Sequence, residues 1–175
     1  YIIYNVLKSA ASESEKTSVF LGGPTAVQRQ NIDNVTFVSS TSGKNSTAWD
    51  VSAQQDKSIL AWYTTNSNGS YKVYVGSDAP MFGNVNSRYL FHFIGFGEKC
   101  TSTETITNLN LLTVSNVTSM RDMFWMTGWR SMTKLDLGDN FDTSNVTEME
   151  CMFGETGSQA MTTLNLGSKF NTSKV

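Results

Sequence analysis

The ten residues "SNVTSMRDMF" from Ser115 to Phe124 recur almost unchanged as "SNVTEMECMF" from Ser144 to Phe153. The second copy begins 29 positions after the first, and a third copy begins at Ser173, again 29 positions later. A fixed period of this length is typical of proteins built from stacked repeats. Each repeat in such a protein is too small to bury its apolar face alone, and it does so by packing against its neighbours.

An earlier and shorter unit precedes these two copies. The stretch "ITNLNL" (Ile106–Leu111) matches "MTKLDL" (Met132–Leu137) with an offset of 26 positions. The three missing residues lie between Leu111 and Ser115, where the later units carry Gly-Asp-Asn and Gly-Ser-Lys. A change of length at one fixed point of a repeat predicts a loop on one face of the stack.

The leucines of each unit alternate with polar residues. In "TKLDL" (Thr133–Leu137), Leu135 and Leu137 point to one side, which is the pattern of a short, half-buried strand. We expect the equivalent leucines of successive units to lie in register on adjacent parallel strands. The expected inward rows are Leu109, Leu135 and Leu164, and beside them Leu111, Leu137 and Leu166.

The repeated ten residues show a longer period. Val117, Met120 and Phe124 fall at positions i, i+3 and i+7, which is one stripe of a helix. Ser115 and Ser144 stand where a helix N-cap belongs. The fold class predicted from these patterns is α/β. The predicted architecture is a leucine-rich-repeat-like solenoid of short parallel strands plus short helices. It covers residues 86–175 and breaks off within a repeat.

Residues 1–85 predict a β-rich N-terminal cap that covers the first end of the stack. The stretches "NVTFVSS", "SILAWYTT" and "SYKVYVGS" are rich in β-branched and aromatic residues, as strands are. The last two are joined by "NSNG", which predicts a hairpin turn. The opening "YIIYNVL" suggests a strand, whereas the role of residues 1–17 stays open.

The repeat motif resembles that of a known family. "FDTSNVTEMECMF" followed by "MTTLNLGSKFNTS" is similar to the BspA-like leucine-rich-repeat surface proteins of bacteria. The upstream run "AWDVSAQQDKSILAWY", "YKVYVG" and "NSRYLF" resembles the segment that often precedes such repeats. The resemblance covers residues 35–175. It implies an extracellular or cell-surface protein whose signal and anchor lie outside this segment, and it implies no particular ligand.

Composition excludes several classes of partner. The 13 basic and 15 acidic residues give a formal charge of −2, which provides no electrostatic footprint for nucleic acid or for a polybasic membrane contact. No apolar run approaches the ~20 residues of a spanning helix, so we expect no direct membrane insertion. Asn, Ser and Thr account for 58 of the 175 residues, a composition that favours an extracellular location.

The chain offers few residues for catalysis or cofactor binding. His92 is the only histidine, and its apolar flanks in "LFHFIGF" favour a packed side chain over a catalytic base. Cys100 and Cys151 cannot build a four-ligand zinc site, and whether they form a disulfide stays open. We therefore expect no enzyme activity and no cofactor.

The aspartate series and the Asn-X-Ser/Thr sequons can each be interpreted as structural or as functional. Asp136, Asp139 and Asp142 could suggest calcium, but the next unit replaces them with Asn165, Ser168 and Asn171, which favours solvated loop residues. Asn-X-Ser/Thr sequons could accept glycans, although the two within the repeat are better explained by hydrogen bonds to backbone. The sequons begin at Asn34, Asn45, Asn68, Asn116, Asn145 and Asn171.

Candidate binding residues lie on two surfaces. Residues between the inward leucines must face outward, since side chains alternate along a strand. These positions form two polar ladders, Asn108, Lys134 and Thr163 in one, and Asn110, Asp136 and Asn165 in the other. Trp125 and Trp129 belong to one unit only and could anchor a partner, but covering the seam between cap and repeats explains them better.

The leading functional hypothesis is a non-catalytic cell-surface binding or adhesion module. Its repeat surface would be presented to protein or glycan partners. The alternative is a structural spacer or assembly subunit of a bacterial cell-surface protein, with self-assembly through its repeats.

Overall fold

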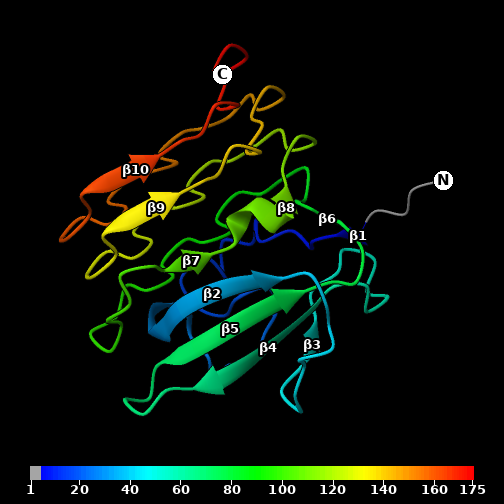
Figure 1. Ribbon diagram of the computed structural model, residues 1–175, viewed down its shortest axis with the longest axis vertical. Coiled ribbons are helices and arrows are strands. Elements are labelled where there is room, and N and C mark those ends of the chain that lie inside the picture. Colours follow the sequence, from blue (N-terminus) through cyan, green and yellow to red (C-terminus); the bar gives the residue numbers. More distant parts are fainter. Residues whose placement is uncertain (1–4) are drawn as a thin grey trace.

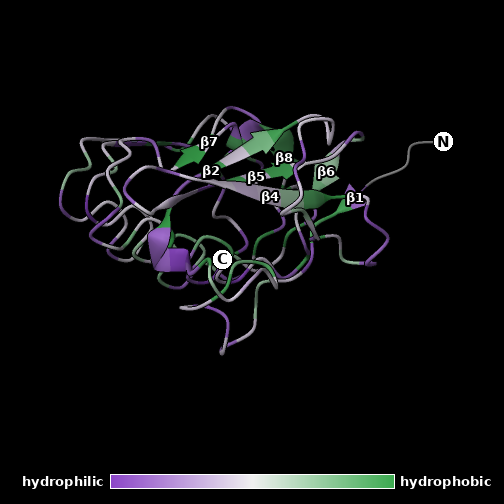
Figure 2. Ribbon diagram, turned by 90° about the horizontal axis from the view of Figure 1, so that it is seen from below, coloured by the Kyte–Doolittle hydropathy of each residue, from purple (hydrophilic) through white to green (hydrophobic). Residues whose placement is uncertain are grey.

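The computed structural model describes residues 5–175, which form a mostly β structure (Figure 1). The strands are β1 (Asn5–Val6), β2 (Ile32–Val38), β3 (Trp49–Asp50), β4 (Leu60–Thr65), β5 (Tyr71–Gly76), β6 (Met81–Phe82), β7 (Ile106–Thr107), β8 (Leu112–Thr113), β9 (Lys134–Asp136) and β10 (Thr163–Asn165). The helical elements described are two 3-10 helices of three residues, η1 (Arg29–Asn31) and η2 (Leu109–Leu111). Most labelled strands lie in one layer, and irregular segments form the other (Figure 2).

The predicted fold class is therefore wrong. The chain is not an α/β solenoid with helices, because its strands form three separate sheets and its described part contains no α-helix. Within residues 5–175, no helix is long and apolar enough to cross a membrane.

The largest sheet contains the strands that the sequence predicted for the N-terminal part. Its strand order is β3-β4-β5-β2-β7, with β4 and β5 antiparallel and β2 parallel to both β5 and β7. The predicted hairpin between β4 and β5 is confirmed, and Asn66 closes its turn by donating to the Ser70 carbonyl at 2.8 Å. Val35, Phe37, Val73 and Val75 point from this sheet into the core, where all four are fully buried.

Two smaller sheets complete the strand layer. The first has the order β1-β6-β8 and the second pairs β9 with β10, all in parallel. Strands on both sides of residue 85 pair with one another, since β2 pairs with β7 and β6 pairs with β8. A single hydrophobic core extends across this position, from Leu7 to Met152.

The predicted leucine rows are partly confirmed. Leu135 and Leu164 lie in register on β9 and β10, as expected. Leu109 is buried but belongs to η2 and not to a strand, so the three-strand row is wrong at its first position. Leu137 is fully buried, whereas Leu164 is 43% exposed because β10 is an edge strand among the residues described.

The repeated segments contain consecutive turns where short helices were predicted. Asp122 (φ 53°), Met126 (φ 56°) and Gly128 (φ 58°) adopt the left-handed conformation. A left-handed residue cannot continue a right-handed helix, so these positions exclude one. The same conformation recurs at Tyr89, Phe93 and Gly95 in the preceding unit and at Cys151, Glu155 and Gly157 in the following unit. The apolar stripe was nevertheless identified correctly, because Val117 and Phe124 are fully buried.

Neighbouring units are joined by backbone hydrogen bonds from every second residue. The N–H groups donate across the boundary with N···O distances of 2.8 or 2.9 Å, from Met120 to Glu148, Asp122 to Glu150, Phe124 to Met152 and Met126 to Gly154. The same pattern joins the preceding unit, from Ser87 to Ser119, Tyr89 to Arg121, Phe91 to Met123 and Phe93 to Trp125. The intervening N–H groups, those of Met123, Trp125 and Thr127, close turns within their own unit. The turns therefore satisfy their backbone donors without a helix.

Side chains reinforce the stacking of the units. The ring of Phe124 stacks between those of Phe91 and Phe153, with centroid distances of 5.4 and 5.5 Å. Asn116 donates its amide to the Gly83 carbonyl and Asn145 donates to the Ser115 carbonyl, both at 2.8 Å. The predicted backbone bonding of these two sequon asparagines is confirmed, but at turns and not at a helix start.

Arg29 covers the carbonyl end of the first unit. Carbonyl oxygens at Leu90 and His92 have no earlier unit to accept from, and the Nη1 atom of Arg29 donates to them at 3.3 and 3.0 Å. The same atom donates to the Tyr89 carbonyl at 2.6 Å, and Nε donates to the Val19 carbonyl at 3.0 Å. Burial lowers the pKa of Arg29 to about 9, so the guanidinium stays charged at neutral pH.

We predict that Arg29→Met lowers the free energy of unfolding by about 3 kcal/mol or more, because it leaves several buried carbonyl groups without a donor. Arg130→Met is the matched control, since Arg130 is exposed and lies over the Trp129 ring, and we expect a loss below about 1 kcal/mol. Urea unfolding of both variants measures the difference. Equal losses would show that Arg29 does not close the stack.

Candidate functional site

The two polar ladders lie where the strand pattern placed them on β9 and β10. Lys134, Asp136, Thr163 and Asn165 are all exposed. Asp136 connects the ladders, because it accepts a hydrogen bond from the Asn165 amide at 3.1 Å and lies 3.9 Å from the Lys134 ammonium. These four residues form one polar surface over the sheet.

The first positions of the ladders lie on a different kind of element. Asn108 precedes η2 with a left-handed backbone (φ 60°), and Asn110 is within η2. The Asn108 amide donates to the Phe37 carbonyl at 3.3 Å. Because η2 replaces the strand expected here, β9 has no strand partner on this side among residues 5–175.

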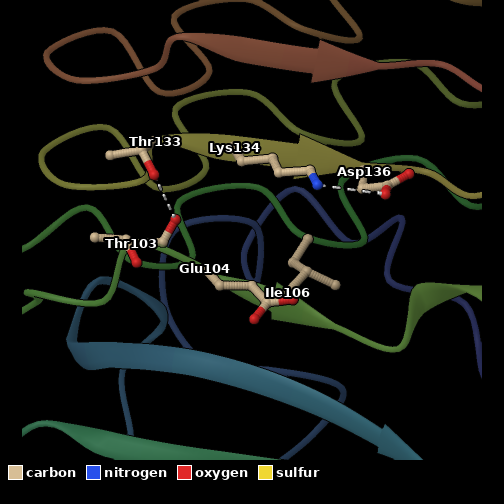
Figure 3. A pocket seen from close by; sticks show the side chains of 6 residues that line it. All are labelled: Thr103, Glu104, Ile106, Thr133, Lys134 and Asp136. Atoms are coloured by element: carbon tan, nitrogen blue, oxygen red, sulfur yellow. Dashed lines mark hydrogen bonds and ion pairs between the residues drawn. The ribbon is translucent and has the colours of Figure 1, made fainter.

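The interruption leaves a slot between β7–η2 and β9 (Figure 3). At one end, the Thr133 N–H donates to the Thr103 carbonyl at 3.0 Å and joins the two segments. At the other end, a side-chain carbon added to Gly138 would lie 3.4 Å from the Asn110 Cβ, so the segments approach again. The cavity between has a volume of about 310 Å³ and is lined by Thr103, Glu104, Ile106, Thr133, Lys134 and Asp136.

The β9 wall of the slot presents unpaired backbone groups. The Leu137 N–H donates to the Asn165 carbonyl at 2.9 Å, so Leu135 and Leu137 are the residues whose backbone groups face β10. In a parallel pair the alternate residues face the other way. The N–H and C=O groups of Lys134 and Asp136 therefore face the slot.

The β7 wall of the slot also presents unpaired backbone groups. The Val35 N–H donates to the Thr105 carbonyl at 2.8 Å, which leaves the N–H and C=O groups of Ile106 on the opposite edge of β7. No hydrogen bond joins this edge to β9 within residues 5–175. Both walls can consequently bond to a ligand.

Two further cavities continue the slot along the outer sheet face. One, of about 440 Å³, extends past Asn108 and Asn110 to Asp139, and the other, of about 490 Å³, extends over β2 to Lys72. Glu104 lines all three cavities. The side chains that line the slot and these two cavities carry four carboxylates and two ammonium groups. The carboxylates are those of Asp33, Glu104, Asp136 and Asp139, and the ammonium groups are those of Lys72 and Lys134. The residues described contain no group of three or more His, Cys, Asp or Glu that could hold a metal ion.

The slot brings together only part of the predicted set. Asn108, Asn110, Lys134 and Asp136 line it or its continuation, whereas Glu104 and Ile106 were not predicted from the sequence. A signal did exist, because the repeat is three residues shorter between Leu111 and Ser115. A unit of different length is where the pairing of neighbouring strands is most easily interrupted.

Trp125 and Trp129 lie in the turn segments and do not line the slot. Trp125 stacks on His92 at 4.7 Å and on Phe93 at 6.2 Å between ring centroids. Trp129 contacts the Phe96 ring and donates its indole N–H to Glu155 at 3.1 Å. Both side chains are half-buried, so they cover the boundary between the first two units.

His92 is packed, as its apolar flanks predicted. Its side chain is buried, and Nδ1 lies 2.7 Å from the Lys16 carbonyl oxygen. Burial is the main cause that lowers the pKa of His92 to about 4. Such a histidine stays neutral at pH 7 and supports the ring stack.

The cysteines are separate and free. Cys100 is buried, where desolvation raises the pKa of its thiol to about 12, and Cys151 is exposed. The open question of a disulfide is thus answered in this structure by two thiols.

Comparison with known proteins finds one family model that matches the repeats. Residues 95–175 match the family described as "Mycoplasma protein of unknown function, DUF285". No curated protein and no solved structure matches the chain significantly. The matched range contains β7 to β10 and therefore the slot. The resemblance to BspA-like proteins stays a prediction.

The buried histidine predicts a pH dependence. Because the folded pKa of about 4 lies below the ordinary value of 6.5, the unfolded chain binds the proton first on acidification. The stability present above pH 6.5 should therefore decrease as the pH falls toward 4. We expect His92→Phe, which keeps a ring against Trp125, to reduce this slope in the unfolding free energy. Parallel curves for the two proteins would contradict the prediction.

Proposed function

We propose that this chain is a non-catalytic binding module that presents the slot and its polar rim to a protein or glycan partner. The bacterial cell surface, implied by the resemblance to BspA-like proteins, is the proposed location. The observation that carries the proposal is the slot between β7 and β9, where two strand edges face each other without pairing.

Unpaired strand edges support binding because they offer backbone donors and acceptors at fixed positions. Proteins use such edges to bind extended segments through main-chain hydrogen bonds, while side chains around the edge provide specificity. Here the backbone groups of Ile106 face those of Lys134 and Asp136 across the cavity. Both walls belong to sheets, so the site is formed before any partner arrives, which lowers the entropic cost of binding.

The side chains favour a polar partner. Asn108, Asn110 and Asp139 supply amide and carboxylate groups along the rim. Only Ile106 and Leu109 are apolar in the adjoining cavity, so little hydrophobic area is available. Hydrogen bonding would supply most of the specificity. A slot of this size favours weak binding by a single site and tighter binding by several sites together.

One observation favours the alternative role of spacer or assembly subunit. Neighbouring units are held together largely by backbone hydrogen bonds, which any sequence of the same conformation can form. A stack of this kind can be extended without a change in its side chains. A spacer needs no conserved chemistry in the slot, and this separates the two roles experimentally.

The test replaces three residues together with alanine: Asn110 and Asp136, which line the slot or its continuation, and Asn165, whose amide donates to Asp136. Binding of the purified chain to immobilised glycan and peptide arrays is measured by fluorescence. We expect the parent chain to bind members of one array and the triple variant to lose at least about tenfold in affinity, since it removes polar groups worth about 1 kcal/mol each.

The matched control carries alanine at three exposed positions away from the slot, Glu148, Ser158 and Gln159. It should bind as the parent chain does. Binding that survives the triple substitution would reject the slot. Absence of binding to both arrays would favour the spacer.

A further inference from the structure

A second groove lies on the outer face of β4 and β5, beside the loop of residues 39–48. Its volume is about 470 Å³, within the range of small-molecule sites. It is lined by Val38, Ser39, Ser40, Ser42, Gly43, Asn45, Trp62, Thr64 and Tyr74. None of these residues lines the slot, so the two sites are independent.

The groove is uncharged. Its lining consists of hydroxyl, amide, aromatic and aliphatic groups, without an Asp, Glu, Lys or Arg side chain. The slot, in contrast, is lined by Glu104, Lys134 and Asp136. The lining offers no opposite charge to a phosphate, a carboxylate or an ammonium group, each of which would lose hydration in the groove. The Lys72 ammonium lies outside the lining, 5.0 Å from the centroid of the Tyr74 ring.

Trp62 points to a ligand that accepts a hydrogen bond. The residue is 4% exposed, yet among the described residues its indole N–H has no hydrogen-bond partner. This nitrogen is not fully buried. It belongs to the small part of Trp62 that solvent reaches. Buried tryptophans usually satisfy this group, as Trp49 does by donating to the Leu21 carbonyl at 3.1 Å.

Several hydroxyl groups around the groove are likewise available. Within the part of the chain that the structure describes, the side chains of Ser39, Ser42, Thr64 and Tyr74 make no hydrogen bond. Each hydroxyl can donate and accept. Apolar contact comes from Val38 and from the rings of Trp62 and Tyr74, which stack at 5.7 Å with an interplanar angle of 12°.

The loop that forms the wall is held in place. Thr41 bonds to both carboxylate oxygens of Asp78 at 2.9 Å, and these bonds lower the pKa of Asp78. Asn45 donates its amide to the Tyr63 carbonyl at 2.9 Å. The groove is therefore formed before a ligand binds.

We propose that this groove binds a neutral saccharide. A sugar ring offers oxygen atoms to the indole N–H, hydroxyl groups to those of Ser39, Ser42 and Thr64, and C–H groups to the apolar lining. It has the same mixture of donors, acceptors and apolar patches without net charge. This site lies outside the proposed slot and does not rest on it.

Saturation-transfer difference NMR tests the proposal with the methyl glycosides of glucose, galactose, mannose and N-acetylglucosamine. We expect transfer to the ring protons of at least one glycoside. Gly43→Leu should abolish it, because a Cβ at this position lies 3.7 Å from Trp62 Cζ2 and the added side chain fills the groove. Ser46→Leu adds the same side chain at an exposed position of the loop outside the lining and should keep the signal.

Trp62→Phe removes the N–H but keeps a ring, and we expect at least a tenfold weaker affinity with unchanged circular dichroism. The triple variant of the slot should bind the glycosides normally, so failure of one site is distinguishable from failure of the other. Absence of transfer to all four glycosides, or a signal that survives Gly43→Leu, would overturn the proposal.

Discussion

The stacking of the repeats depends on backbone hydrogen bonds that use every second residue of the turn segments. The N–H groups of Met120, Asp122, Phe124 and Met126 donate to the next unit. Those of Met123, Trp125 and Thr127 close turns within their own unit. Left-handed residues at fixed positions make this alternation geometrically feasible, since they turn successive N–H groups away from a common helix axis. The rings of the buried Phe91 and Phe124 and of the half-buried Phe153 then stack in register as a consequence.

At the first unit, the carbonyl groups of this hydrogen-bond ladder need donors from outside the repeats. The N-terminal part of the chain supplies them. Arg29 brings a charged donor to the carbonyl groups that would otherwise accept from an earlier unit. The strand side is closed similarly, because β2 pairs with β7. The slot lies where this closure meets the repeats: η2 takes the place of a strand, and β9 is left with a free edge.

Residue type and periodicity in the sequence identified much of this correctly. β-Branched and aromatic residues predicted β2, β4 and β5, and alternation predicted β9. Leu135, Leu137 and Phe124 are buried as expected. The helices were wrong because an apolar stripe reports which residues are buried and not which backbone conformation buries them. The backbones of Asp122, Met126 and Cys151 are left-handed although none of these residues is glycine, so residue type did not predict this conformation. Alternation in the sequence predicted the ladder residues of the slot. It did not predict the gap, which exists because η2 forms in place of a strand.

Residue-resolved amide hydrogen exchange tests the alternating ladder most directly. In the last described unit, Cys151 and Phe153 have no hydrogen bond from their N–H groups among residues 5–175, whereas the equivalent N–H groups of Asp122 and Phe124 bond to the next unit. We expect Asp122 and Phe124 to exchange slowly, and Cys151 and Phe153 to exchange far faster than Met152 and Gly154, which close turns. Equal protection of Phe124 and Phe153, with uniform protection along both segments, would indicate helices and contradict the account.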